Sequence, residues 1–275
     1  MNQRKRLKIG IVGCGAIGSS LSKEIVTSLC KDACLVALYD IKPQKAQALS
    51  RKLTRGIKLC VGNLNALIKC SDLVIEASSA RASWEIASRA LSSGRKVMVM
   101  SVGGMVGHLD QLYELTRKHS AMVYFPSGAI SGIDALKAAN IAGVRKVILT
   151  TRKHPNAFGG VEYVSKHFKL TGLKHDKLLF NGSAAQAVKY FPQNVNVAAV
   201  LGLAGIGMRK TRVRIIADPK VNKNIHEIEI ESKVAKIFTR TENILHPQNP
   251  KTSFLAVLSA IATLKQILQP IKIGT

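Results

Sequence analysis

Short apolar runs alternate with longer amphipathic segments along the first 125 residues. The segments at 43–53 and 81–94 repeat apolar residues at helical spacing, and the second ends at Gly94, a typical helix stop. Buried strands that alternate with helices predict an α/β fold built on a doubly wound parallel sheet. The six strand-like runs are LKIGIV (7–12), CLVALYD (34–40), IKLCV (57–61), DLVIEAS (72–78), KVMVMS (96–101) and AMVYF (121–125).

The pattern changes after Pro126, where strand-like runs predominate and two helical segments separate them. This arrangement predicts a second, α+β domain with a mixed sheet. A last helix, about 252–268, repeats apolar residues every three positions and is expected to pack back on the core. We expect domains at 1–125 and 126–250, and a C-terminal segment at 251–275. The strand-like runs of the second domain are 145–153, 177–182, 211–218, 225–232 and 234–240.

The chain has 275 residues, of which 47% are hydrophobic, so it can bury a substantial core and is neither disordered nor fibrous. It carries 41 Lys and Arg against 16 Asp and Glu, a formal net charge of +25. Such an excess can mark a nucleic-acid partner, but the basic residues are scattered and no nucleic-acid-binding motif accompanies them. A basic solvated surface that attracts anionic ligands is the favoured interpretation, and nucleic-acid binding is the alternative.

The amino-terminal stretch permits two interpretations, a signal sequence or a buried strand followed by a glycine turn. Basic residues at 4–6 precede an apolar run, and the residues up to Cys14 imitate a lipoprotein cleavage box. The run is interrupted by Lys8 and is shorter than a signal core, and no segment reaches the length of a membrane span. The five cysteines lie within the first 70 residues without a CxxC pair, which favours buried thiols over a metal or disulfide framework. We expect a cytoplasmic protein without a membrane segment or a metal site.

The glycine pattern GCGAIG at 13–18 follows the first predicted strand and opens the first helix. Gly13 permits a tight turn, Gly15 lets the backbone approach a pyrophosphate, and Gly18 lets the helix pack against the strand. The helix N-terminus presents free N–H groups to the phosphates. Asp40 stands 22 residues after Gly18 at the end of the second strand, where its carboxylate can accept hydrogen bonds from a ribose. These features predict a Rossmann domain that binds a dinucleotide through Gly13, Gly15, Ala16, Ile17, Gly18 and Asp40.

The choice between NAD and NADP stays open at this point. Asp40 favours NAD because its charge repels a 2′-phosphate, whereas Lys42 and Lys45 just beyond it weaken that preference. The simpler interpretation of the two lysines is solvated charge on a helix surface. Either cofactor implies hydride transfer and leaves the substrate to the second domain.

The stretch NKNIHEIEIES predicts a strand that carries His226 on its apolar face. Strand alternation places His226 with Ile228 and Ile230, and the glutamates on the opposite face. From this pattern alone a satisfied core histidine and a catalytic acid or base are equally good interpretations. Asn194 and Asn196 interrupt an apolar segment, and residues 251–253 precede the final helix, so these polar groups either bind a ligand or cap a helix.

Six blocks in the same order resemble the L-aspartate dehydrogenase family over nearly the whole chain. They are IGIVGCGAIG, PSGAISGIDALKAA, TTRKHP, FPQNVNVAAVLGLAG, NIHEIEIES and NPKTSFLAVLSA. The resemblance implies NAD(P)-dependent oxidation of L-aspartate to iminoaspartate, which hydrolyses to oxaloacetate and ammonia or feeds quinolinate synthesis on the route to NAD. It also implies a homodimer, and it allows product hand-off to quinolinate synthase.

The resemblance assigns roles to single residues of this chain. The active-site histidine of the family falls on His226, and contacts on the nicotinamide side of the cofactor fall on Ala129 and Asn196. The segment SVGGM at 101–105 departs from the family, which is expected to have a GA pair there. We therefore expect Gly104 to loosen this loop slightly.

The two carboxylates of aspartate need cationic or N–H partners. Lys251, Thr252 and Ser253 are the first candidates. The second candidates are Arg152, Lys153 and His154, within the motif TTRKHP. Two other functions are kept as alternatives, a related oxidoreductase such as homoserine dehydrogenase and a non-catalytic protein that senses a cofactor or binds nucleic acid.

Overall fold

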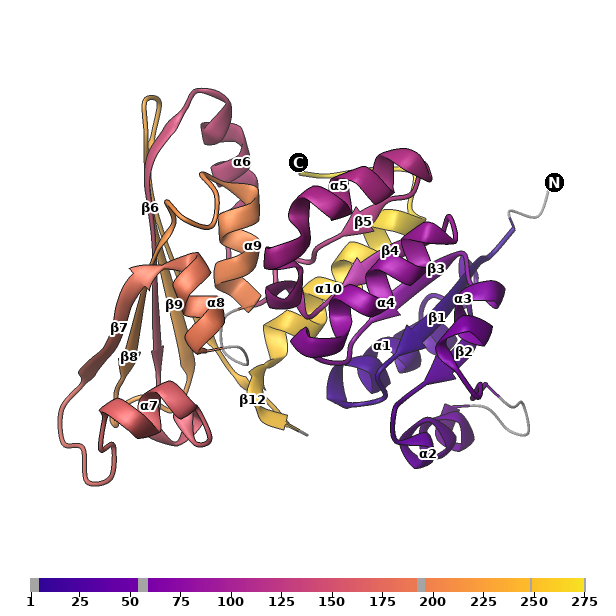
Figure 1. Cartoon of the computed structure of the whole chain (residues 1–275), viewed down its shortest axis with the longest axis horizontal. Coiled ribbons are helices and arrows are strands. Elements are labelled where there is room, and N and C mark those ends of the chain that lie inside the picture. The colour runs from indigo at the N-terminus through magenta and orange to yellow at the C-terminus, as the bar shows by residue number, and fades with distance from the viewer. Residues whose placement is uncertain (1–4, 54–58, 192–195, 248, 275) are drawn as a thin grey trace. The chain divides into compact units, whose positions relative to one another are not determined.

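The computed structural model describes residues 5–53, 59–191, 196–247 and 249–274 (Figure 1), with the side chains at 250 and 251 excepted. It divides into two compact units. The first consists of the chain up to Pro126 together with Ala260–Lys272, and the second of Ser127–Ser259 with the residues from Ile273. The last helix, α10 (Phe254–Leu268), therefore contributes residues to both units.

The first unit is built on a sheet of five parallel strands in the order β2-β1-β3-β4-β5. The strands are β1 (Leu7–Val12), β2 (Ala33–Tyr39), β3 (Leu73–Glu76), β4 (Lys96–Val99) and β5 (Val123–Tyr124). The chain places β1 and β3 side by side at the centre, so the order reverses at β1. This is the doubly wound topology predicted from the alternating pattern, and ligands in such sheets bind at the carboxyl ends of the strands near this reversal.

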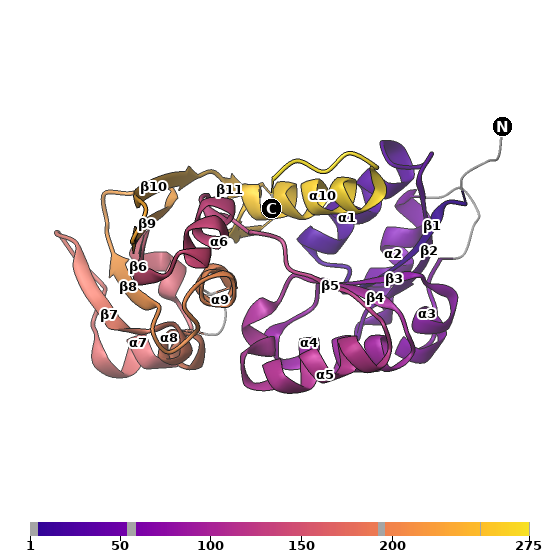
Figure 2. The same ribbon diagram turned by 90° about the horizontal axis from the view of Figure 1, so that it is seen from above.

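Helices cover both faces of this sheet (Figure 2). On one face α1 (Ala16–Thr27), α2 (Pro43–Leu53) and the end of α10 share a core with Ile9, Ile11 and Leu73, and this core includes the fully buried Leu264. On the other face α3 (Leu64–Cys70), α4 (Ala80–Ser92) and α5 (Leu109–Lys118) pack on Val12, Val74 and Val97. Each buried Leu or Ile contributes about 1.5–3 kcal/mol to the free energy of unfolding. The packing of the last helix against this core agrees with its apolar spacing.

Two local expectations for the first unit were wrong. The described part of the strand expected at 57–61 forms only an isolated bridge between Leu38 and Cys60. The loop around Gly104 is not loosened, because it forms a short 3-10 helix, η1 (Val102–His108), packed tightly on α4. A Cβ at position 104 would collide with the carbonyl oxygen of Ala80 and the hydroxyl of Ser83, so glycine is required there for close packing.

The second unit is built on a mixed sheet with the order β10-β9-β6-β8-β7. Only β6 and β8 pair in parallel, and the other neighbours are antiparallel. The strands are β6 (Val144–Lys153), β7 (Lys177–Ser183), β8 (Arg212–Ala217), β9 (Asn224–Ser232) and β10 (Lys236–Asn243), and a separate pair is formed by β11 (Leu245–His246) and β12 (Asn249–Ser253). The mixed sheet agrees with the α+β prediction for this part of the chain.

More helical segments occur in the second unit than the two expected. The structure has η2 (Pro155–Phe158), α6 (Ile133–Ile141), α7 (Glu162–His167), α8 (Ala184–Tyr190) and α9 (Asn196–Ala204). The helices α7 and α8 have six and seven residues, too few for a helical period to emerge from the sequence. Figures 1 and 2 show α6, α8 and α9 on one face of the sheet.

The register between β6 and β9 arranges this covered face. Leu149 lies opposite Ile228, and Thr151 lies opposite His226 two pairs further along. Residues that lie opposite each other in an antiparallel pair project to the same face. His226 is 3% exposed, so the prediction that it projects with Ile228 and Ile230 is confirmed.

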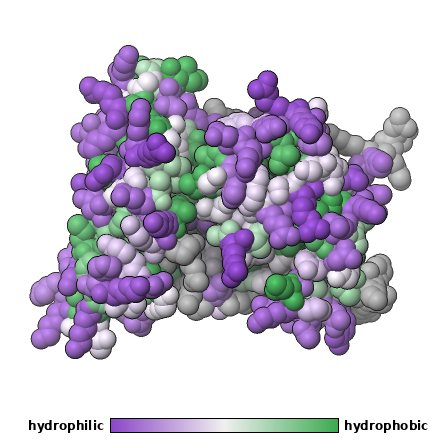
Figure 3. Space-filling view, in the orientation of Figure 1, coloured by the Kyte–Doolittle hydropathy of each residue, from purple (hydrophilic) through white to green (hydrophobic). Residues whose placement is uncertain are grey.

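Among the described residues, no helix has the length and apolar character that crossing a membrane requires. Hydrophilic side chains are spread over the face of the molecule seen in Figure 3, on both units. This distribution fits the scattered basic residues of the sequence.

Candidate functional site

The glycine turn between β1 and α1 has the local geometry that the sequence predicts. Gly13 has φ +97°, a conformation that favours glycine, and a Cβ there would collide with the carbonyl of Ala77. A Cβ on Gly18 would collide with the carbonyl of Gly13, so this glycine permits α1 to pack against the turn. Gly15 is the residue that caps α1, and a Cβ built on it meets nothing within 4 Å. The space beside Gly15 is therefore open to a ligand.

Asp40 is held at this turn by two backbone amides. Its carboxylate accepts hydrogen bonds from the N–H of Cys14 at 2.8 Å and from the N–H of Lys42 at 2.9 Å. The structure thus brings Asp40 to the glycine pattern, 26 residues away in sequence. Burial, together with the charge of Asp40, raises the pKa of the Cys14 thiol to about 12, so this thiol stays neutral and is not a nucleophile at physiological pH.

Glu76, at the end of β3, organises the neighbouring loops and was not singled out from the sequence. Its carboxylate accepts hydrogen bonds from the amide and hydroxyl of Ser78 and from the amide and hydroxyl of Ser101. Glu76 is fully buried, and burial raises the pKa of its carboxyl despite these four bonds. The carboxyl group therefore joins the loops that follow β3 and β4, at the edge of the sheet where the glycine turn lies. The only sequence signal was an acidic residue in an apolar strand.

These residues fit a dinucleotide. An open position at Gly15, the first-turn amides of α1 including those of Ala16 and Ile17, and a fixed carboxylate at Asp40 are the features that hold a pyrophosphate and a ribose. Lys42 and Lys45 lie two and five positions after Asp40 in the sequence and are exposed.

His226 occupies the polar end of the covered face in the second unit. Its Nδ1 is 3.0 Å from the hydroxyl of Thr151, the residue opposite it on β6. Burial, followed by the positive charge of Lys153, lowers the pKa of His226 to about 3. The imidazole is therefore neutral at physiological pH. Among the described side chains only Thr151 hydrogen-bonds to the ring, which leaves Nε2 for a ligand.

Ala129 and Asn196 lie in the same unit as His226. The carbonyl of Ala129 accepts hydrogen bonds from Thr241 and Asn243, both at 3.1 Å, and Thr241 also donates to the carbonyl of His226 at 3.4 Å. Asn196 is the first residue of α9, and a Cβ at Gly128, next to Ala129, would contact the neighbouring Val197 at 3.4 Å. The structure thus brings the three residues that the family resemblance selected into one neighbourhood.

The segment before α10 contributes one buried hydroxyl to this neighbourhood. Ser253 accepts a hydrogen bond from the side chain of Asn224 at 3.1 Å, two residues before His226. The hydroxyl of Thr252 accepts one from Asn249 at 3.0 Å. The side chain of Lys251 lies outside the described residues.

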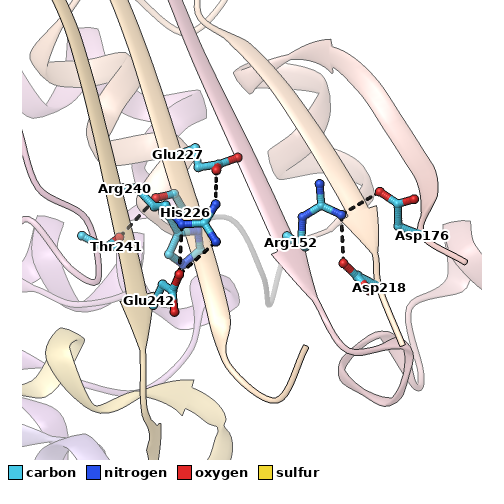
Figure 4. A network of polar contacts seen from close by, with 8 residues as sticks. All are labelled: Arg152, Asp176, Asp218, His226, Glu227, Arg240, Thr241 and Glu242. Atoms are coloured by element: carbon cyan, nitrogen blue, oxygen red, sulfur yellow. Dashed lines mark hydrogen bonds and ion pairs between the residues drawn. The ribbon is translucent and has the colours of Figure 1, made fainter. Parts of the chain in front are cut away.

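The three residues of the second candidate set separate in the structure. Arg152 projects to the other face of the sheet, where it pairs with Asp176 at 2.7 Å and Asp218 at 3.0 Å, and Figure 4 shows it directed away from His226. These two hydrogen bonds raise the pKa of Arg152. Lys153 is buried, and burial lowers its pKa to about 8. His154 caps η2 by accepting the N–H of Asn156.

Charged residues of β9 and β10 form a second network on the open face. Arg240 pairs with Glu227 and Glu242 (Figure 4). These side chains lie near His226 in that view, but they occupy the alternate positions of β9 and β10 and therefore project to the opposite face of the sheet. Arg240 and Glu242 are exposed and Glu227 is half-buried, so these ion pairs stabilise the fold little. Within the described part of the chain, no group of three or more His, Cys, Asp or Glu side chains has the geometry of a metal site.

Two family models match this chain. One, described as the C-terminal part of aspartate dehydrogenase, covers residues 134–267, and the other, described as the NAD-binding domain of homoserine dehydrogenase, covers residues 13–126. A curated L-aspartate dehydrogenase of Methanosarcina mazei is 47% identical over 98% of this chain and 100% of its own length. The chain belongs to the L-aspartate dehydrogenase family.

Solved structures agree with membership of the L-aspartate dehydrogenase family. A crystal structure of aspartate dehydrogenase from Thermotoga maritima matches with a TM-score of 0.71 and 26% identity over 98% of this chain and 100% of that one. A homoserine dehydrogenase from Thiobacillus denitrificans matches with a TM-score of 0.62 at 12% identity over 98% of this chain and 74% of its own. The second likeness shows a shared fold only. The aspartate dehydrogenase family, rather than the homoserine alternative, therefore accounts for the whole chain.

Proposed function

We propose that this chain oxidises L-aspartate to iminoaspartate, with NAD or NADP as hydride acceptor. The observation that carries the proposal is a neutral, buried His226 beside Ala129, in a chain that aligns over 98% of its length with curated L-aspartate dehydrogenases. The nicotinamide cofactor takes up the hydride that leaves C2 of the substrate.

The first unit holds the cofactor in this proposal. Gly13 and Gly18 shape the turn, Gly15 leaves room for the pyrophosphate, and Asp40 accepts hydrogen bonds from the ribose of the adenosine half. The amides of Ala16 and Ile17 lie in the first turn of α1 and bind phosphate oxygens. In the second unit Ala129 and Asn196 contact the nicotinamide half.

His226 acts as the acid and base of the reaction. Its ring is oriented by the hydroxyl of Thr151 through Nδ1, so Nε2 faces the substrate. Because the ring is neutral, Nε2 can take a proton from water that adds to the imine carbon and return it to the departing ammonia. The overall change is aspartate and oxidised cofactor to iminoaspartate, reduced cofactor and a proton, and hydrolysis then gives oxaloacetate and ammonia.

The biological setting follows from the family resemblance. We propose a cytoplasmic homodimer whose iminoaspartate is either hydrolysed or passed to quinolinate synthase for NAD synthesis. The substrate-binding candidates Thr252 and Ser253 adjoin the buried Asn224, and Lys251 belongs to the same segment.

A substrate panel tests the proposal. Purified protein is mixed with NAD or NADP and with L-aspartate, D-aspartate, L-glutamate or L-homoserine, and the absorbance of reduced cofactor is followed. Reduced cofactor is expected with L-aspartate alone, and His226→Ala is expected to lower kcat on the order of a hundredfold or more, the usual loss on removal of a general base. Oxidation of L-homoserine in place of L-aspartate contradicts the proposal.

A further inference from the structure

The carboxyl end of β3 adjoins the glycine turn. In the parallel pair of β1 and β3, Glu76 is opposite Val12, the residue before Gly13. The next residue, Ala77, donates its amide to the carbonyl of Val12 at 2.8 Å. A Cβ on Gly13 would collide with the carbonyl of Ala77 and come too close to the Cα of Ser78. The turn that is proposed to receive the pyrophosphate therefore rests on the two residues that follow β3.

The carboxylate of Glu76 fixes these two residues. Its Oε1 accepts hydrogen bonds from the amide of Ser78 at 2.7 Å and from the hydroxyl of Ser78 at 2.8 Å. The same oxygen accepts one from the hydroxyl of Ser101 at 3.0 Å, and Oε2 accepts one from the amide of Ser101 at 2.9 Å. Glu76 is fully buried, so bulk water does not compete for these bonds. One side chain thereby joins the support of the glycine turn to the loop after β4.

The loop after β4 is itself packed against the start of α4. The amide of Gly104 donates to the carbonyl of Ser101 at 3.0 Å, which holds η1 at that loop. A Cβ on Gly104 would collide with the carbonyl of Ala80, the first residue of α4. Because Ala80 follows Ser78 by two positions, a shift of either loop is transmitted to the other and to the glycine turn.

The geometry requires two acceptor atoms on the side chain at position 76. Oε1 faces the backbone N–H of Ser78, and Oε2 faces that of Ser101. A backbone N–H donates and cannot accept, so an amide side chain of the same shape matches only one of the two. In Glu76→Gln the NH2 group would face a buried N–H without a hydrogen bond. Such a mismatch is costly, and the loops are expected to move apart to relieve it.

We propose that Glu76 is a positioning residue for the dinucleotide, which holds the residues under the glycine turn where pyrophosphate binding requires them. It acts through residues 77 and 78, because its carboxylate is buried beneath the turn and bonded to the two loops. The inference rests on the proposed function only in so far as a dinucleotide binds at this turn. It does not depend on which amino acid is oxidised.

The test compares Glu76→Gln with Asp72→Asn in the full chain. Asp72 precedes β3 at the opposite end of the strand, and its carboxylate accepts the backbone N–H of Lys8 at 2.9 Å. The control therefore makes the same change from carboxylate to amide away from the glycine turn. Dissociation constants of NAD and of ADP, which has the diphosphate but no nicotinamide, are measured by calorimetry. Thermal melts identify the temperature range in which each variant is folded.

In folded Glu76→Gln both dissociation constants are expected to rise on the order of tenfold, about the cost of one buried donor without a partner. Asp72→Asn is expected to bind both ligands as the wild type does. Unchanged constants in Glu76→Gln, with only a lower melting temperature, overturn the proposal because Glu76 would then stabilise the fold alone. Weaker binding of NAD with normal binding of ADP also overturns it, since the effect would lie at the nicotinamide half.

Ser101→Ala is the second variant, for the case that Glu76→Gln does not fold. It removes one hydroxyl donor to Glu76 and keeps both backbone bonds, so both constants are expected to rise about threefold. Unchanged constants in Ser101→Ala would then overturn the proposal.

Failure of the proposed function has a different signature. A wild type that binds NAD but does not oxidise L-aspartate contradicts the proposed function, while the role of Glu76 is still decided by the binding constants. A wild type that binds neither NAD nor ADP overturns the role of Glu76.

Discussion

The protonation state of His226 is determined by its surroundings rather than by its own chemistry. The ring is buried, its Nδ1 contacts a neutral hydroxyl, and the nearest charge is a lysine. Burial and the positive charge of Lys153 both disfavour the imidazolium ion, and the hydroxyl of Thr151 supplies no negative charge to offset them. A neutral ring beside a cation suits an enzyme that binds an anionic substrate and must then accept a proton.

The low pKa of His226 predicts a specific loss of stability in mild acid. The pKa is 6.5 in the unfolded chain and about 3 in the folded protein. Between these values the unfolded state binds the extra proton, so the free energy of unfolding falls as the pH drops below 6.5. Lowering the pH to 5 should therefore destabilise the wild type by about 2 kcal/mol more than His226→Gln.

Urea unfolding at pH 7 and pH 5 measures this difference. The control is the variant His175→Gln, at an exposed position. Between pH 7 and pH 5 this variant should lose as much free energy of unfolding as the wild type. Equal losses in His226→Gln and the wild type would show that the ring titrates alike in both states.

Single residues of the site were predictable only where one strand carried the signal. Strand alternation identified the face of His226 because period-2 patterning is local. Its partners Thr151 and Thr241 were not identified, and neither was Asn243, which bonds to Ala129, since these residues are neighbours only through strand pairing between distant segments. A prediction of the register between β6, β9 and β10 would have found them.

At the scale of elements, the turn between β1 and α1 contains one glycine that the packing of the fold requires, Gly18, and one that ligand binding is proposed to require, Gly15. Gly18→Ala should disturb the packing of α1 on β1, because its methyl group meets the carbonyl of Gly13. Gly15→Ala should leave the fold intact, since its methyl group enters open space, yet that space is where the pyrophosphate is proposed to bind. We expect a lower melting temperature for Gly18→Ala and a normal one for Gly15→Ala, with NAD binding weakened in both.

Melting curves and titration of NAD by intrinsic fluorescence or calorimetry distinguish these outcomes. Gly62→Ala serves as a control, because a methyl group there also meets open space but lies away from the turn in sequence. Normal NAD binding by Gly15→Ala would place the pyrophosphate elsewhere.

The elements themselves were predictable in proportion to their length and apolar content. Buried parallel strands such as β1 and β3 are predominantly apolar runs, and both appeared in the sequence. The short helices α7 and α8, of six and seven residues, are too short for a helical period to emerge, although α8 begins at a capping box formed by Ser183 and Gln186. The run at 57–61 was misleading, because an apolar run specifies burial but not strand pairing.

At the scale of the whole molecule, the chain returns to its first unit at Ala260, after the main part of the second unit. Ala260 and Leu264 of α10 are fully buried in the core formed with α1 and β1. The cofactor-binding unit therefore cannot be completed before the final helix has been made. Sequence periodicity predicted that α10 packs on a core but not on which one, since both units offer apolar surfaces.

The net charge of +25 belongs to the whole molecule and not to one site. Basic residues on both units raise the potential around an enzyme whose cofactor and proposed substrate are anions, which favours their approach at low ionic strength. The charge thus needs no nucleic-acid partner to have a physical effect.

Transfer of hydrogen from C2 of L-aspartate to the cofactor is the measurement that tests the central claim most directly. L-Aspartate deuterated at C2 is incubated with the protein and oxidised cofactor, and the reduced cofactor is analysed by mass spectrometry. The account predicts that the reduced cofactor carries the deuterium, with little of it formed by His226→Ala. Reduced cofactor without deuterium, or none at all from the wild type, would contradict it.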